Sequence, residues 1–276
     1  MYRYLRLIIL FVIFAIAACS PEYRLARQYV RKQVGNTVMI MPSYELYKDN
    51  LTISYDTNVI YSPVQFDSIA WEQSCYIKHV SDSIFLTTFT SSLIKELKKE
   101  EFEVYVSDNS NDFQELPEPK WLIKIPKLQL NENHCISMYG VSSENQENYE
   151  YSLEGLRTNM ISLLSWFESS QASEGNRQGL FYQESIMDGL TSGSKLILDM
   201  GNEGLQQNRD SLEIEDIYTL ADESGRKHAG ILFNHFMNEY VKNNLPPAII
   251  QKKYFYYNRI SQSLRPGLNE WYELAD

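Results

Sequence analysis

The chain has 276 residues, 43% hydrophobic and 22% charged, so it can bury a sizeable core and is not wholly disordered. Its 25 Lys and Arg against 36 Asp and Glu give a formal net charge of −11. Such a chain lacks the basic surface that displaces counterions from a nucleic acid backbone, so no nucleic-acid partner is expected.

Residues 1–18 have the pattern of an export signal peptide. Arg3 and Arg6 form a positive start, and residues 7–15 are an uninterrupted apolar run. That run is shorter than the roughly 20 apolar residues of a transmembrane helix. The segment leads into Ile16-Ala17-Ala18-Cys19, which resembles the lipobox of bacterial lipoprotein precursors.

This resemblance implies cleavage before Cys19 and lipidation of its thiol and its new amino group. Several acyl chains, palmitate among them, would give a stable anchor in the lipid bilayer. Ser20, not Asp, follows Cys19. By resemblance to the sorting of other lipoproteins, this favours the outer membrane, with the body facing the periplasm and surface display as the alternative. A plain secretory signal with a coincidental cysteine is the other interpretation.

Residues 19–35 are expected to form the membrane tether, with an amphipathic helix over 22–34. Its polar face carries Arg24, Arg27, Arg31 and Lys32. These side chains could contact anionic lipid headgroups. The alternative is an ordinary helix whose basic face is simply solvated.

Residues 36–248 are expected to form a single α/β (α+β) domain. Thr37–Met41 reads as a buried strand, and the tyrosine-rich stretch 43–70 as a hairpin-like excursion. Apolar residues recur every fourth position in Ser81–Glu100, which predicts an amphipathic helix. Phe102–Val106 alternates as a half-buried strand. Parallel pairing of the two strands would require a right-handed crossover.

The second half of the domain is expected to continue the sheet as an antiparallel meander after a polar turn over 108–119. The predicted strands are Trp121–Leu130, Tyr151–Phe167 and Leu180–Met187. Pro126 should lie at an edge or a bulge, because proline cannot donate to a strand ladder.

The domain should close with a packing helix. The stretch 189–207 reads as a loop or a weak helix, and Ile214–Val241 as a long helix that Pro246-Pro247 stops. The predicted fold is a mixed sheet of about five or more strands, with a strand–helix–strand unit, a meander and a C-terminal packing helix.

This order of elements resembles the small α/β domains of envelope lipoproteins, of the curli-secretion type and the TolB amino-terminal type. The likeness covers roughly residues 36–245. It lies in the pattern of elements alone, so it assigns no functional residue.

The sequence contains short motifs known from enzymes, but they do not form a set of catalytic residues. Ser92 and Lys95 fit Ser-x-x-Lys, but they lie in mid-helix on a lysine-rich stretch expected to face water, and no Lys-Thr-Gly occurs. His228 and His235 share a helix face without a third ligand and read as packing residues. No catalytic residue, metal ligand or cofactor is predicted, and an enzyme is not expected.

Two kinds of modification are predicted besides lipidation. Cys75 and Cys135 could form a disulfide in an oxidising compartment, or remain as free cysteines. Three Asp-Ser-apolar triplets, centred on Ser68, Ser83 and Ser211, resemble the acceptor sites of a bacterial O-glycosylation system.

The C-terminal segment, residues 249–276, is locally basic and rich in aromatic residues. It carries Tyr254, Phe255, Tyr256 and Tyr257, followed by Trp271 and Tyr272. Such residues are enriched at interfaces, so the segment is a candidate docking site for other envelope proteins. The alternative is that it folds back as a last strand or wraps the domain.

These observations together predict a non-enzymatic membrane-anchored lipoprotein that serves as an envelope assembly, scaffold or accessory subunit. The alternative is a surface-displayed glycan-binding lipoprotein, because the 20 tyrosines could stack on sugars.

Overall fold

The structure is a computed structural model of the chain. It describes residues 20–32, 36–52, 62–106, 110–117, 119–145, 148–171, 177–188, 197–198, 205–206, 211–267 and 272–274. The leader and Cys19 lie outside these ranges.

The described residues form both helices and strands. The helices are α2 (Pro21–Lys32), α3 (Pro63–Gln73), α4 (Asp82–Lys99), α5 (Ser110–Glu115) and α6 (Ile214–Asn244), with a 3-10 turn η1 (Ile77–His79). The strands are β1 (Thr37–Met41), β2 (Leu46–Asn50), β3 (Glu103–Val106), β4 (Lys120–Asn145), β5 (Asn148–Gln171), β6 (Arg177–Met187), β7 (Ile197–Leu198), β8 (Leu205–Gln206), β9 (Tyr254–Asn258), β10 (Ser263–Gly267) and β11 (Tyr272–Leu274).

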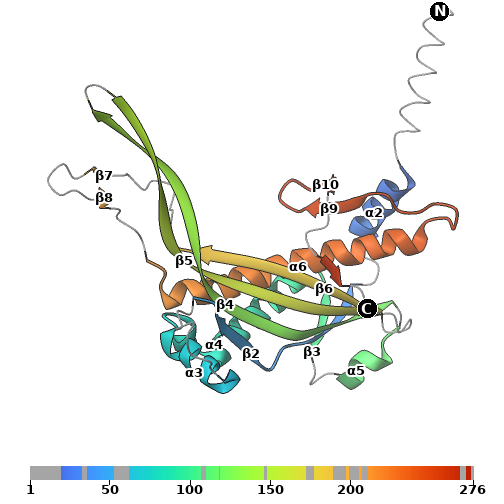
Figure 1. The fold of residues 1–276 in the computed structure, drawn as a ribbon. Coiled ribbons are helices and arrows are strands. Elements are labelled where there is room, and N and C mark those ends of the chain that lie inside the picture. Colours follow the sequence, from blue (N-terminus) through green and yellow to red (C-terminus); the bar gives the residue numbers. More distant parts are fainter. Residues whose placement is uncertain are drawn as a thin grey trace, which may run out of the picture.

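Seven strands make one mixed sheet (Figure 1). Its order is β11-β6-β5-β4-β1-β3, with β2 paired to β4 as well. β1 pairs in parallel with both β3 and β4, whereas β4, β5 and β6 form an antiparallel meander. The α/β class, the strand–helix–strand unit, the meander and the long C-terminal helix are therefore confirmed.

Pro126 lies at an irregularity of the sheet, as predicted. The register between β4 and β5 shifts between Lys124 and Lys127. A bulge leaves one residue out of the ladder, which accommodates a residue without an N–H group.

One face of the sheet packs on α4 and α6. Side chains alternate along the strands, so Ile40, Ile123 and Leu128 are fully buried on the helix side. Trp121 stacks on Phe236 of α6 with ring centroids 4.7 Å apart. This layer is the main hydrophobic core of the domain.

The other side of α6 is covered by α2 and the β9–β10 hairpin (Figure 1). The α2 residues Ala26 and Tyr29 are 0% and 1% exposed, and the Tyr29 ring lies 5.7 Å from that of Phe233. The consecutive residues 231–238 of α6 are all buried. A helix that is enclosed on all sides needs no polar stripe, which explains the sequence of this segment.

Two local predictions are wrong. The described residues of the stretch 43–70 do not form a hairpin: β2 pairs in parallel with residues 128–132 of β4, and the next described element is α3. The reason is that β1 covers only residues 120–124 of β4 and leaves the rest of that edge open. The predicted polar turn contains the short helix α5, which buries Phe113 to 4% exposure.

The β4 and β5 strands are far longer than predicted, at 26 and 24 residues. Their outer parts, residues 134–145 and 148–159, extend beyond the last pair with β6 as a two-stranded ribbon, here called the arm (Figure 1). At about 3.3 Å per residue the arm spans roughly 40 Å. The predicted strand Tyr151–Phe167 includes residues 151–159 of the arm, whereas residues 134–145 of β4 and their pairing with β5 were not predicted.

Candidate binding site

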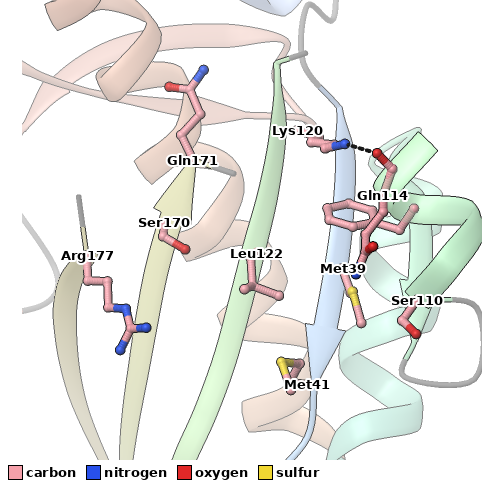
Figure 2. A pocket seen from close by; sticks show the side chains of 10 residues that line it. Met39, Met41, Ser110, Gln114, Lys120, Leu122, Ser170, Gln171 and Arg177 are labelled. Atoms are coloured by element: carbon pink, nitrogen blue, oxygen red, sulfur yellow. Dashed lines mark hydrogen bonds between the residues drawn. The ribbon is translucent and has the colours of Figure 1, made fainter. Parts of the chain in front are cut away.

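A cavity lies on the sheet face away from α4 and α6 (Figure 2). It has a volume of about 600 Å³ and is lined by Met39, Met41, Ser110, Phe113, Gln114, Lys120, Leu122, Ser170, Gln171 and Arg177. These residues come from β1, β4, the end of β5, the start of β6 and α5. The cavity therefore exists only because the sheet brings distant segments together.

Strand alternation creates the apolar floor of this cavity. Val38 and Ile40 point into the core, so Met39 and Met41 must point to the opposite face, and their neighbour Leu122 in β4 does the same. Methionine side chains are flexible and polarisable, so they adapt to ligands of varied shape.

Lys120 is the most buried cation of the cavity, at 7% exposure. Its Nζ donates hydrogen bonds to the carbonyl oxygens of Gln114 and Leu116, at 2.8 and 2.9 Å, and lies 5.4 Å from the Phe113 ring centroid. It thereby satisfies carbonyls at the C-terminal end of α5, where a cation is favourable. The Lys120 charge is engaged in holding α5 against the sheet.

The remaining polar groups stand around the rim. Arg177 is exposed at the start of β6, Gln171 lies at the end of β5, and Gln114 lies across the cavity on α5 (Figure 2). An apolar floor with a few polar groups at its edge is the usual composition of a small-molecule or peptide pocket. The lining contains no histidine, cysteine or carboxylate that could act as a base or a nucleophile.

A second, smaller cavity adjoins the first at Met41. Its volume is about 280 Å³, and Tyr44, Tyr47 and Lys124 are among its lining residues. Tyr44 is 80% exposed and Tyr47 is 43% exposed. Lys127 lies 4.9 Å from the Tyr47 ring centroid. The open sheet face thus combines aromatic and cationic groups.

Away from these cavities, a buried carboxylate of β4 binds the backbone at the start of η1. Glu132 is 2% exposed and accepts hydrogen bonds from the Ser74 hydroxyl and from the backbone N–H groups of Cys75, Tyr76 and Ile77, at 2.7 to 3.1 Å. It satisfies the donors at the start of η1, which otherwise have no partner. Glu132 is therefore a structural anchor between η1 and β4.

The two α6 histidines are packed between aromatic rings. His228 stacks on Phe167 at 4.9 Å, and burial lowers its pKa to about 4. Burial, and then the charge of Lys242, lowers the pKa of His235 to about 3. No cluster of three His, Cys, Asp or Glu able to hold a metal ion occurs among the described residues.

Ser92 does not face water, which corrects the prediction. It is 8% exposed, and its hydroxyl donates a hydrogen bond to Asp222 of α6. The side chain stands between α4 and α6, because those two helices cross closely at Gly225. Its role is helix packing.

The two cysteines predicted to pair are not joined in this structure. Cys75 is a free, exposed cysteine that donates its backbone N–H to Glu132. Cys135 lies in the arm, where its backbone pairs with Thr158, and its side chain is outside the described residues. The bridge stays a prediction, to be tested by thiol titration of denatured, non-reduced protein.

The three serines predicted as glycan acceptors are all exposed. Ser68 lies in α3, Ser83 in the first turn of α4, and Ser211 three residues before α6 begins. Exposure is necessary for such a modification, and intact-mass analysis of the native protein would test it.

The aromatic C-terminal segment folds back on the domain. Phe255 is 1% exposed, whereas Tyr254, Tyr256 and Tyr257 are half-buried. The backbone of Tyr272 pairs with Phe181 of β6, and Trp271 lies outside the described residues. Phe255 is thus part of the protein's own core and is not available to a docking partner.

Two asparagines of α6 hold this segment, and the sequence analysis missed them. Asn238 donates to the carbonyl of Phe255 and accepts from its N–H, both at 2.9 Å, as a paired strand would. Asn234 accepts from the N–H of Tyr257 at 3.0 Å. Their spacing of four residues within a buried helical run was the available signal.

Comparison with known proteins adds no family assignment, since no protein-family model and no curated protein matches the chain. Among the described helices, none is both long and apolar enough to cross a membrane.

Proposed function

We propose that this protein is a non-enzymatic lipoprotein, anchored through Cys19 at the periplasmic face of the outer membrane, that serves as an assembly or scaffold subunit. The observation that carries the proposal is the position of α2, which begins two residues after the lipobox cysteine. Because Ala26 and Tyr29 of α2 are buried against α6, the anchor continues directly into the folded body. A rigid connection between the lipid anchor and the folded domain suits a scaffold protein that holds a partner protein at a membrane.

The arm supports the scaffold part of this proposal. It projects from the end of the sheet that is far from α2 (Figure 1). Over the described residues, its strands pair only with each other beyond Glu132 of β4 and before Met160 of β5. Unpaired strand edges readily accept another chain. The arm is therefore the part best placed to reach a partner envelope protein.

The test is a variant without the arm. Residues 135–158 are replaced by Asn-Gly, which joins the paired residues His134 and Asn159 through a two-residue turn. Asn159 keeps its hydrogen bonds to Asp188, so the base of the arm is preserved. We expect an unchanged melting temperature and the loss of proteins that crosslink to the parent in native membranes. An unchanged set of crosslinked proteins would contradict the scaffold role.

Glycan binding is the second candidate, favoured by the exposed Tyr44 and Tyr47 beside the smaller cavity. Exposed tyrosine rings can stack on the apolar face of a sugar. A glycan array probed with the parent and with Tyr44→Ala tests this function. Val64→Ala, at another exposed residue, serves as the matched control. Signals that are absent, or equal in all three proteins, would exclude a glycan site at these tyrosines.

A further inference from the structure

The exposed surface of α2 is basic. On the outer face of this helix, opposite Ala26 and Tyr29, the exposed residues Arg24, Arg27 and Arg31 form a basic stripe. Their spacing of three and four residues places them on one side of a helix. The only acidic residue of α2, Glu22, is buried at 7% exposure.

The loop between α6 and β9 contacts the first turn of α2, on the face that carries Glu22. The backbone N–H of Lys252 donates to Glu22 at 2.6 Å, which fixes the loop at the first turn of α2. Ile249 and Ile250 of this loop are 40% and 80% exposed, and Lys252 and Lys253 are exposed as well. Residues 249–253 are here called the isoleucine loop.

Both features lie close to the lipidation site. Cys19 precedes Glu22 by three residues, so their Cα atoms are at most about 11 Å apart. The acyl chains that Cys19 is proposed to carry would enter the bilayer at this point. Exposed isoleucines and lysines at such a position have the chemistry of a bilayer interface, in which apolar side chains enter the acyl boundary and cations meet the headgroups.

Charge explains why this face, and not another, would meet an anionic surface. The stripe and the isoleucine loop contribute five basic residues, on a chain whose net charge is −11. An anionic leaflet repels the acidic body and attracts this basic face, which selects one orientation.

We infer that the basic stripe and the isoleucine loop form a second contact with the bilayer, which orients the anchored domain on anionic lipid. This inference rests on the anchored part of the proposed function. The occupant of the surface is the lipid bilayer itself.

The test is photo-crosslinking of the lipidated full protein in vesicles of phosphatidylethanolamine and phosphatidylglycerol. A benzophenone-bearing phenylalanine replaces Ile250, and in the control it replaces Val64, which is 75% exposed on α3 at the far end of the molecule (Figure 1). We expect about tenfold more phospholipid adduct at position 250 than at position 64.

A charge variant tests the electrostatic part. Arg24→Gln, Arg27→Gln, Arg31→Gln, Lys252→Gln and Lys253→Gln are combined, with Lys95→Gln plus Lys98→Gln on α4 as the matched control. The combined variant should still float with the vesicles, because the acyl chains hold it. Its adduct at position 250 should fall about threefold or more, while the control keeps the parent yield.

The outcomes separate the two proposals. Protein that floats but gives equal adducts at positions 250 and 64, or an unchanged yield in the charge variant, overturns the second contact and leaves the anchor intact. Protein that does not float, and whose mass shows no acyl chain, overturns the anchor and with it the contact that depends on it.

Discussion

Gly225 permits the closest approach of α4 and α6. A Cβ atom at this position would lie 2.4 Å from the backbone oxygen of Phe89 and 3.0 Å from the nitrogen of Leu93. Backbone cannot move aside as a flexible side chain does, so the two helices would have to separate. The hydrogen bond between Ser92 and Asp222 spans the same crossing.

Gly225→Ala should therefore lower the free energy of unfolding by about 3 kcal/mol, through overpacking at the helix crossing. Gly230→Ala is the matched control, because a Cβ there meets nothing within 4 Å. It should stabilise by about 0.5–1 kcal/mol through helix propensity. Urea unfolding of both variants checks the pair, and equal effects would disprove the close-approach argument.

His235 is the second residue for which we expect a measurable effect, here on the pH dependence of stability. It is 2% exposed, and its Nε2 lies 3.1 Å from the Ser169 hydroxyl of β5. Burial, followed by the charge of Lys242, lowers its pKa to about 3. The folded protein thus keeps the His235 ring neutral, whereas in the unfolded chain the ring takes up a proton at about pH 6.5. The stabilisation from neutral burial is complete above that pH and is lost as the pH falls toward 3.

His235→Gln removes the titrating group and keeps a side chain able to bond Ser169. Between about pH 7 and pH 5 the parent should lose about 2 kcal/mol more stability than this variant. Denaturant midpoints across that range measure the difference. Stability curves that stay parallel would show that His235 does not contribute to acid sensitivity.

At the scale of the element, the β9–β10 hairpin is part of the domain. Besides the hydrogen bonds from Asn234 and Asn238, Arg259 forms an ion pair with Glu100 at the end of α4. Desolvation by burial, which outweighs the Arg259 charge, raises the pKa of Glu100 to about 7. Removing the hairpin would uncover Phe233, which lies 5.8 Å from Tyr257.

Truncation after Pro247 should therefore cost roughly 5 kcal/mol, since it removes the hairpin backbone that Asn234 and Asn238 bond and exposes aromatic core. The melting temperature should fall by about 10 °C or more. Truncation after Gly267 is the control, because it removes β11 but keeps the hairpin. If the two truncated proteins have the same melting temperature, the hairpin does not stabilise the domain.

At the scale of the whole molecule, stability should be distributed unevenly. Residues 231–238 of α6 are enclosed by the sheet, α4, α2 and the hairpin. Within the part of the chain that the structure describes, each strand of the arm pairs only with the other. A two-stranded ribbon is marginal without a packed face.

Hydrogen exchange should show this gradient. Amides of the α6 centre should exchange only through global unfolding, and those of the arm with an opening free energy lower by about 3 kcal/mol or more. Peptide-level mass spectrometry compares the two segments directly. If amides of the arm and of the α6 centre exchanged equally slowly, the predicted stability gradient would be wrong.

The sequence predicted the elements whose stability arises from their own patterning. Periodicity located α4 and α6 and the inner parts of the meander, and Pro126 located the bulge, because burial on one face leaves a regular apolar trace. The packing of His228 and His235 could also be predicted, since their motif lacked further ligands. The lipobox is a local signal, so the lipidation hypothesis needs no fold.

Only the tertiary structure decided the features that depend on distant partners. β2 forms because β4 leaves an edge open beside it. The arm exists because residues 134–145, which were not predicted as a strand, pair with residues 148–159. The larger cavity joins three stretches that are far apart in the chain, residues 39–41, 110–122 and 170–177. The isoleucine loop lies beside the start of α2 through the contact of Lys252 with Glu22, 230 residues apart. Local propensity cannot encode such neighbours, because burial, edge pairing and charge clustering arise only once the chain has folded.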